Sequence, residues 1–262
     1  MPIHTDVFRD PHEVDRPQPI VAFAEDKPKD QHSEPHSHAR GQLVHILQGS
    51  TTVFTEMGTF IVPPERAVWI PGGMVHRPVY PAKTQFRSLY LREDWSARLS
   101  DKPVVVQVTP LLRELIQEIM AAPRDYALDG PTARVAQVIV DQLKSLPDAP
   151  LQLPMPINHA LLKELCQSIL RCPAHLPSLA DAAERTLMSQ RTFERRFFAE
   201  TGGWSYRKWC GQAKLFRALE LLSAGRSVGD VAFKLGYEGP SPFISQFRKA
   251  FGTTPGKYFK VK

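Results

Sequence analysis

The sequence has few cysteines and no long apolar run, and both shortages exclude classes of protein. Its three cysteines are an odd number without a close pair, which favours reduced thiols, and we expect all three to be buried in helices: Cys166, Cys172 and Cys210. The apolar runs fall well short of the roughly 18 residues that cross a bilayer. The polar N-terminus, MPIHTDVFRDPHEVD, lacks the apolar segment of a signal peptide. We therefore expect a cytoplasmic protein with no membrane partner.

Acidic residues are scarce in the C-terminal part of the chain. Residues 1–150 carry 16 Lys and Arg against 19 Asp and Glu, whereas residues 151–262 carry 17 against 8. A basic segment joined to a mildly acidic one favours contact with a polyanion. Charge alone does not distinguish such a contact from a solvated basic surface.

Short β-branched and aromatic runs, separated by Gly and Pro, fill residues 19–91 and predict a small β-sandwich or barrel. Two segments with helical spacing of apolar residues, Thr109–Ala122 and Pro131–Leu146, predict an antiparallel helical hairpin. Its apolar surface fits either the barrel or a second subunit, and we favour a homodimer. The predicted parts are a β-rich domain at 1–105 with a loose arm at 1–18, the hairpin at 106–148, a proline-rich linker at 149–156, and an all-α domain at 157–262.

Two related segments of the all-α domain each pair a short helix with a longer one. They are Leu179–Gly202 and Ser227–Pro255, and Phe193, Phe197 and Gly202 recur 50 residues later as Phe243, Phe247 and Gly252. The phenylalanines form the predicted buried stripes. A short helix, a tight turn and a longer helix with basic residues opposite its apolar stripe predict a helix-turn-helix, whose second helix enters the major groove of DNA.

The predicted DNA-facing side chains lie opposite the phenylalanine stripes. Arg can bridge guanine, Gln can pair with adenine, and Glu can accept from cytosine. The first long helix presents Gln190, Arg191, Glu194, Arg195 and Arg196; the second presents Ser241, Ser245, Gln246 and Lys249. The second set is poorer in base-reading groups, so we expect it to contribute more to phosphate contact and positioning.

Residues from about 157 to 262 resemble the DNA-binding domain of the AraC/XylS family of bacterial transcription regulators. The strongest match is RSVGDVAFKLGYEGPSPFISQFRKAFGTTPGKYF. The positions that carry the family pattern are Gly236-Tyr237, Ser241, Phe243, Phe247-Arg248, Gly252 and Pro255. The departure is the proline pair, Pro240 and Pro242, at the start of the second reading helix. The resemblance implies double-stranded DNA as a partner, and RNA polymerase as another if the protein is an activator.

Seven of the nine histidines fall within the first 76 residues. His36, His38 and Gln42 have even spacing, so one extended strand would place them on one face. This region resembles the cupin fold, whose first motif reads His-x-His-x3-Glu-x6-Gly and whose second contains Pro-x-Gly-x2-His. By that resemblance the metal ligands are His36, His38, Gln42 and His76, holding Fe, Mn, Ni or Zn.

Gln42 stands where the cupin motif has Glu, and a neutral amide weakens the binding of a divalent cation. Three interpretations remain open. The site retains a transition metal, sensed itself or used to hold an effector; or it is a metal-free pocket for a small molecule; or its histidines are hydrogen-bonded remnants of ancestry. His45 has the opposite parity to Gln42 and is expected to face away. Trp69 is expected to pack in the core.

The leading hypothesis is a transcription regulator and not an enzyme. A sensor domain responds to a metal or small molecule and controls promoter occupancy through two helix-turn-helix units. One rival is a cupin dioxygenase fused to a DNA-binding tether, against which stand the neutral Gln42 and the lack of an acid–base pair near His76. Another rival is an architectural DNA binder with an inactive sensor.

Overall fold

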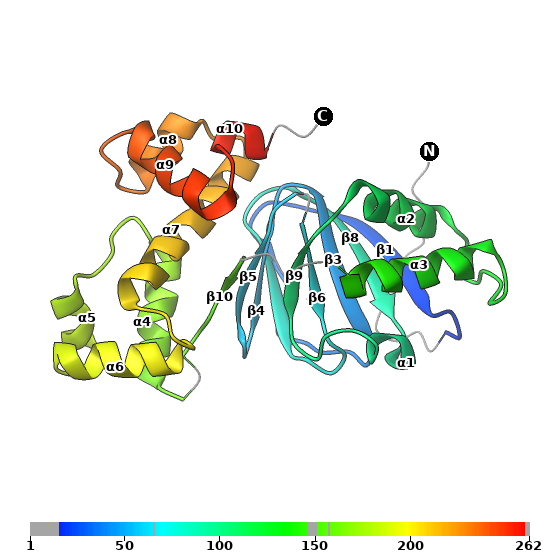
Figure 1. Ribbon diagram of the computed structural model, residues 1–262, viewed down its shortest axis with the longest axis horizontal. Coiled ribbons are helices and arrows are strands. Elements are labelled where there is room, and N and C mark those ends of the chain that lie inside the picture. The colour runs from blue at the N-terminus through cyan, green and yellow to red at the C-terminus, as the bar shows by residue number, and fades with distance from the viewer. Residues whose placement is uncertain (1–15, 65, 146–150, 157, 260–262) are drawn as a thin grey trace. The chain divides into compact units, whose positions relative to one another are not determined.

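The structure is a computed structural model that describes residues 16–64, 66–145, 151–156 and 158–259 (Figure 1). Contacts divide the chain into two compact units, one of residues 1–55 and 62–152, the other of residues 56–61 and 153–262. None of the helices in the described ranges is long and apolar enough to cross a membrane.

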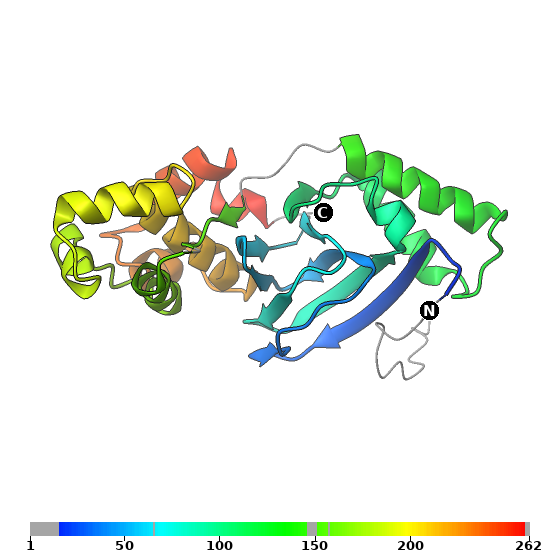
Figure 2. The ribbon, with the colours of Figure 1, turned by 90° about the horizontal axis from the view of Figure 1, so that it is seen from below.

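Two five-stranded sheets form the β-rich part of the chain (Figures 1 and 2). Their orders are β1-β8-β3-β6-β9 and β10-β5-β4-β7-β2. The strands are β1 (Ile20–Lys27), β2 (Gln31–His32), β3 (Gly41–Gln48), β4 (Thr51–Thr55), β5 (Gly58–Val62), β6 (Arg66–Ile70), β7 (His76–Tyr80), β8 (Thr84–Leu91), β9 (Val104–Gln107) and β10 (Gln152–Leu153). The prediction of an N-terminal β-rich fold is confirmed. Sequence reasoning missed β2, β9 and β10, which are short edge strands.

Period-two alternation sends neighbouring side chains of one strand to opposite faces of the first sheet. On β8, Leu89 and Leu91 join an apolar cluster, while Ser88 and Tyr90 contact Gln42 of β3. These four residues, Ser88 to Leu91, are all buried. One face of this sheet is therefore apolar, and the other carries polar side chains.

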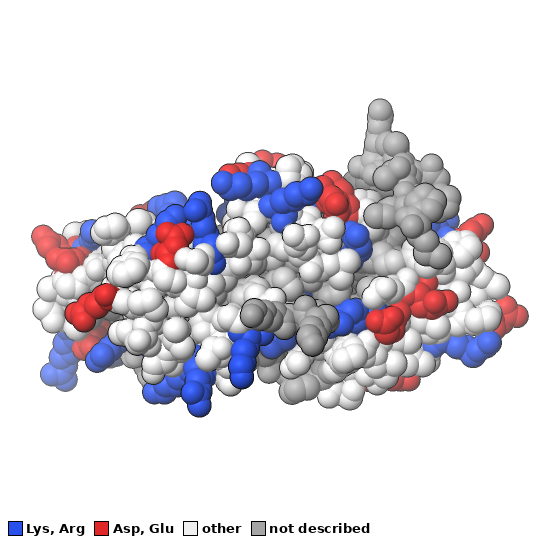
Figure 3. All heavy atoms as spheres, turned by 90° about the horizontal axis from the view of Figure 1, so that it is seen from above, with Lys and Arg blue, Asp and Glu red and all other residues white. Residues whose placement is uncertain are grey.

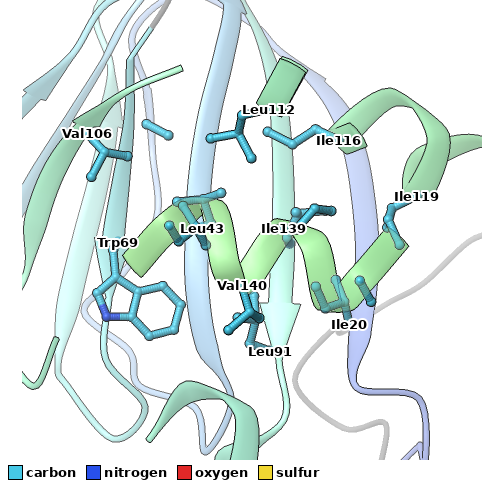
Figure 4. Packing of buried hydrophobic residues seen from close by; sticks show 14 of the residues in the cluster. Ile20, Leu43, Trp69, Leu91, Val106, Leu112, Ile116, Ile119, Ile139 and Val140 are labelled. Atoms are coloured by element: carbon cyan, nitrogen blue, oxygen red, sulfur yellow. The ribbon is translucent and has the colours of Figure 1, made fainter. Parts of the chain in front are cut away.

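A helical hairpin, α2 (Pro110–Ala121) and α3 (Pro131–Ser145), covers the apolar face of the first sheet (Figure 4). Thr109 caps α2 by accepting from Leu112 N at 3.2 Å. Trp69 of β6 lies in the same cluster and is 3% exposed, which confirms its predicted core role. Val138 of α3 is 40% exposed and is not part of this cluster.

The C-terminal region is helical, as predicted. Its helices are α4 (Ala160–Arg171), α5 (Leu179–Arg185), α6 (Gln190–Glu200), α7 (Tyr206–Ser223), α8 (Val228–Lys234), α9 (Pro240–Phe251) and α10 (Pro255–Tyr258); a further single turn, α1 (Glu93–Ser96), follows β8. Cys166 and Cys210 are buried in α4 and α7, but Cys172 follows α4 and is exposed. The prediction of a buried helical Cys172 is therefore wrong.

The two helix pairs, α5–α6 and α8–α9, have the same turn. Met188 N donates to Ala183 O at 2.9 Å, and Tyr237 N donates to Ala232 O at 3.0 Å, 49 residues later. Both alanines are buried, so the helices approach closely where they cross. The left-handed turn residue is Leu187 in the first pair (φ 57°) and Gly236 in the second (φ 72°).

The proline-rich segment predicted as a linker lies partly outside the described residues, since 146–150 are not described. Of the remainder, Leu151, Leu153 and Met155 are buried. Pro154 O accepts a hydrogen bond from Trp209 Nε1 at 2.7 Å. This segment is therefore anchored by apolar packing and a buried indole.

Candidate functional site

Four of the five residues predicted to face DNA on α6 share its exposed side. Gln190, Arg191, Glu194 and Arg195 are exposed, opposite the buried Phe193 and Phe197. Ser189 caps the helix by accepting from Thr192 N at 3.3 Å. The phenylalanine rings pack against each other at 5.5 Å and against Tyr206 of α7. The buried stripe therefore fixes which side chains α6 presents.

Arg196 is exposed too, but it borders a different surface. It lines a hollow with Leu187 and Met188 of the turn, with Leu161 of α4, and with His159, the residue before α4. Arg196 therefore lies beside the α4 flank of the first helix-turn-helix.

The predicted residues of α9 divide into two groups. Ser241, Ser245 and Lys249 line one surface hollow on the exposed side of the helix. Gln246 is turned toward the protein, because its Oε1 accepts from Tyr237 OH at 2.8 Å. Burial raises the pKa of Tyr237 to about 12, so this hydroxyl stays a donor near neutral pH. The hydrogen bond gives Gln246 a structural role that sequence reasoning missed.

Two further residues, Ile244 and Arg248, line the same hollow on α9. Sequence reasoning omitted them from the DNA-facing set, although helical spacing from Ser241 to Ile244, Ser245 and Arg248 signals the shared face. At the 50-residue offset, Ile244 corresponds to Glu194 and Ser245 to Arg195. The two long helices therefore present different chemistry: ionic on α6, and small or apolar with a basic end on α9. Figure 3 shows Lys and Arg side chains distributed over the helical region, with Asp and Glu side chains among them.

The histidine cluster is assembled by a loop and a strand end. His36 forms an isolated bridge to His76 at the start of β7, with both backbone N–H groups donating, at 3.0 and 2.9 Å. Residues 37–40 are not strand, and β3 begins at Gly41, so the prediction of one extended strand through His36, His38 and Gln42 is wrong. The residues nevertheless come together, since one ring nitrogen from each of His36, His38 and His76 lies within 4.8 Å of the others.

Each histidine of the cluster is oriented by a backbone carbonyl two residues away. Nδ1–H donates to Glu34 O from His36 at 2.8 Å, to Arg40 O from His38 at 2.5 Å, and to Met74 O from His76 at 2.9 Å. A carbonyl only accepts, so Nδ1 carries the proton and Nε2 keeps its lone pair. This outer contact is the one that fixes the tautomer of metal-binding histidines. Burial lowers the pKa of His38, which favours its neutral form.

Gln42 is held by three side chains on the polar face of the sheet and is 4% exposed. Its Nε2 donates to Ser88 Oγ at 2.9 Å and to Tyr90 OH at 2.8 Å. With both amide hydrogens used, Oε1 faces His38 Nε2 at 3.2 Å. Two acceptor atoms thus face each other, an arrangement that a shared cation stabilises. The side chains present therefore fit a metal ion with neutral nitrogen and oxygen ligands.

His45 lies apart from this cluster. It is 1% exposed and lies two residues after Leu43 on β3, so the two side chains point to the same face of the sheet. Burial, and then the positive charges of Arg113 on α2 and Arg87 on β8, lower its pKa. Neither of its ring nitrogens has a hydrogen-bond partner among the described residues.

Comparison with known proteins places both parts of the chain. Residues 18–142 match the model of an AraC-like ligand binding domain, and residues 182–260 match a helix-turn-helix domain. The chain is 33% identical over 239 residues to the HTH-type transcriptional regulator NimR of Escherichia coli, covering 91% of this chain and 86% of NimR. The transcriptional activator NphR of a Rhodococcus species is 40% identical over 84 residues, 32% of this chain and 24% of NphR.

A solved structure of ToxT from Vibrio cholerae aligns with a TM-score of 0.39 at 8% identity, covering 91% of this chain and 97% of that one. The NimR match and the two domain models, in the expected order, carry the assignment. The chain therefore belongs to the AraC family of DNA-binding transcription regulators, with a ligand-binding domain ahead of its helix-turn-helix domain.

Proposed function

We propose that this regulator senses a transition metal, or an effector held by one, and that the sensing site does no catalysis. The observation that carries the proposal is the convergence of three imidazoles, with one ring nitrogen of each within 4.8 Å of the others and each ring oriented by a backbone carbonyl. His36, His38, His76 and Gln42 would hold Ni, Zn, Fe or Mn. The neutral amide of Gln42 suits reversible binding better than a carboxylate does.

The test is metal binding to metal-free protein by calorimetry, with DNA affinity measured on the same samples. We expect one ion per chain in the wild type, loss of binding in His76→Ala, and full binding in His32→Ala, an exposed histidine outside the cluster. DNA affinity should change with metal in the wild type and the control only. Metal binding that leaves DNA affinity unchanged would contradict a sensing role.

We further propose that the exposed faces of α6 and α9 read successive segments of the major groove. The 18-residue helix α7 joins the two helix-turn-helix pairs, α5–α6 and α8–α9. Its length of about 27 Å is comparable to the ~34 Å length of one turn of DNA. On α6 the contacts are Gln190, Arg191, Glu194 and Arg195, flanked by Arg196; on α9 they are Ser241, Ser245 and Lys249, joined by Ile244 and Arg248, with Gln246 bracing the helix from behind.

Phosphate contacts should make this affinity strongly salt-dependent. Fluorescence anisotropy with the protein's own upstream DNA, measured over a series of salt concentrations, provides the test. An affinity that does not change with salt would contradict the proposed basic face.

We also propose a homodimer formed through the outer faces of α2 and α3. The inner faces pack on the sheet, so a partner must use the side that carries Leu111 and Val138, which are 53% and 40% exposed. RNA polymerase becomes a further partner if the regulator activates transcription, which takes place in the cytoplasm.

A further inference from the structure

A glycine interrupts the first half of α7, the helix that joins the two helix-turn-helix pairs. Gly211 lies in the second turn of this 18-residue helix. Glycine within a helix is destabilising relative to alanine, because it loses more backbone freedom on folding. A β-carbon at this position would lie 3.3 Å from Nε2 of Gln246 on α9. That is closer than the roughly 3.5–4.0 Å at which atoms normally pack. The glycine therefore gives α9 an approach to α7 that any other residue would obstruct.

The amide that approaches Gly211 is held in place from its other side. Its Oε1 accepts a hydrogen bond from Tyr237 OH at 2.8 Å. The ring of Tyr237 lies 5.5 Å from the ring of Phe243, a fully buried residue of the α9 stripe. The ammonium group of Lys214 on α7 lies 5.4 Å from the centre of the same tyrosine ring. Gln246 is thus fixed by the turn between α8 and α9 and seated against α7.

The first reading helix packs on the other side of α7. The ring of Phe197 on α6 lies 5.5 Å from the ring of Tyr206 and 6.0 Å from that of Trp209. Since an α-helix turns by about 100° per residue, Trp209 and Gly211 point about 200° apart around the axis of α7. The two reading helices are therefore both positioned by α7, from opposite sides of its first half.

The equivalent residue of the first pair has a different position. Arg196 stands 50 residues before Gln246, and it is exposed and borders the hollow beside α4. Resting on the proposed reading of DNA by α6 and α9, we infer that Gln246, seated on Gly211, is a positioning residue that fixes the distance and rotation between the two reading helices. It thereby determines the number of base pairs between the two DNA segments that the helices recognise.

The experiment measures the affinity of full-length protein for DNA sites of altered spacing. A base-substitution panel of the protein's own upstream DNA first locates the two segments. One base pair is then inserted between them or removed, which moves one segment by about 3.4 Å and rotates it by about 35° relative to the other. Fluorescence anisotropy gives the dissociation constant for each length. We expect the wild type to lose about tenfold or more in affinity at either altered spacing, as it would with mismatches in one segment.

Four variants test the contact itself. Gly211→Leu places a side chain where the amide of Gln246 lies, and it should reduce the spacing preference by about threefold or more. Tyr237→Phe, which removes only the hydroxyl that holds Gln246, should act in the same direction. Gln246→Ala should do so too, and Gly211→Leu should add little in that background because the obstructed amide is gone. Gly229→Leu on α8 is the matched control, since no described atom lies within 4 Å of a β-carbon there.

The outcomes are separable. An upstream site in which base changes matter in one segment only, or in none, would overturn the proposed reading by α9. Two segments that the wild type binds equally well at all three spacings would leave that reading standing and overturn the positioning role. A Gly211→Leu variant that loses affinity equally at every spacing, or whose effect simply adds to that of Gln246→Ala, would overturn it as well. The wild-type series and Tyr237→Phe decide the matter even if Gly211→Leu fails to fold.

Discussion

At the scale of single residues, function depends on which atoms the local backbone leaves available. The three cluster histidines use Nδ1 to fix their own orientation, so only Nε2 remains for a ligand. On α6, the packing of Phe193 and Phe197 turns Arg191, Glu194 and Arg195 outward. In both places, the histidines of the cluster and the charged residues of α6, a neighbouring group fixes the direction in which the side chain points.

Replacing Arg195 by Ala should relax discrimination at one base position by ~1–3 kcal/mol. The measurement is anisotropy on a panel of DNA sites in which each base pair is changed in turn. Arg185→Ala, an exposed arginine on α5 rather than on a reading helix, is the control. A uniform loss of affinity over the whole panel would show instead that Arg195 contacts only phosphate.

Ile244 should read a thymine methyl group, because an apolar side chain on the reading face of α9 has no other base partner of its kind. Replacing thymines one at a time by deoxyuridine removes only that methyl. We expect one position at which wild-type protein loses affinity about threefold to tenfold and Ile244→Ala loses none. Equal sensitivity of the two proteins at every position would refute the contact.

Burial, reinforced by Arg113 and Arg87, lowers the pKa of His45 to about 4. As the pH is lowered from about 6.5 to about 4, His45 becomes protonated in the unfolded chain but stays neutral in the folded chain. The free energy of unfolding should therefore decrease, by about 3 kcal/mol in total at pH 4. Above about pH 6.5 this group makes no pH-dependent contribution. Urea unfolding of His45→Leu with chelator present should show a shallower pH slope, whereas His32→Leu should match the wild type.

At the scale of elements, the helix-turn-helix pairs show how far sequence can predict structure. The phenylalanine stripes follow from local chemistry, and the structure confirms them. The serine caps of α5, α6 and α8 and the positive φ of Gly236 obey the same local rules. The equivalent turn at Leu187 could not be predicted, since leucine rarely adopts a positive φ. The strand predicted through His36 and His38 is absent because the even spacing of residues orders side chains only within a regular strand. Here a single bridge between His36 and His76 brings the residues together instead.

The two turns predict opposite responses to glycine. Leu187 adopts φ 57° with its side chain 86% exposed, so Leu187→Gly relieves backbone strain and loses almost no packing. It should be at least as stable as Leu187→Ala, although glycine elsewhere costs about 0.5–1 kcal/mol relative to alanine. Gly236→Leu should lose about 1–2 kcal/mol. Thermal unfolding of the three variants tests this, and a Leu187→Gly variant clearly weaker than Leu187→Ala would contradict it.

At the scale of the whole molecule, sequence predicts the order of parts but not which faces they bury. The amphipathic stripes of α2 and α3 fitted either the barrel or another subunit, and only the structure assigns them to the sheet. Gln246 likewise has an amide that could read a base. The hydroxyl of Tyr237, nine positions away in the sequence, donates to that amide and holds it toward the protein. Periodicity identifies an apolar face and leaves its partner open.

The dimer predicted for this family member should depend on the outer hairpin face. The double variant Leu111→Arg with Val138→Arg should raise the dimer dissociation constant about tenfold or more while leaving the monomer folded, because both side chains are already exposed. Val75→Arg, an equally exposed apolar position on a loop between β6 and β7, is the control. Sedimentation that shows the same dimer in all three proteins would exclude this face.

The unequal chemistry of α6 and α9 has a consequence for the promoter. If α6 and α9 read DNA as proposed, an ionic face followed by a small and apolar one gives the two halves of the DNA site different sequences, so its two ends are distinct. Each chain can then bind in only one heading relative to the start of transcription. Inverting a bound site within its promoter would therefore point the sensor domain the other way along the DNA, at unchanged affinity.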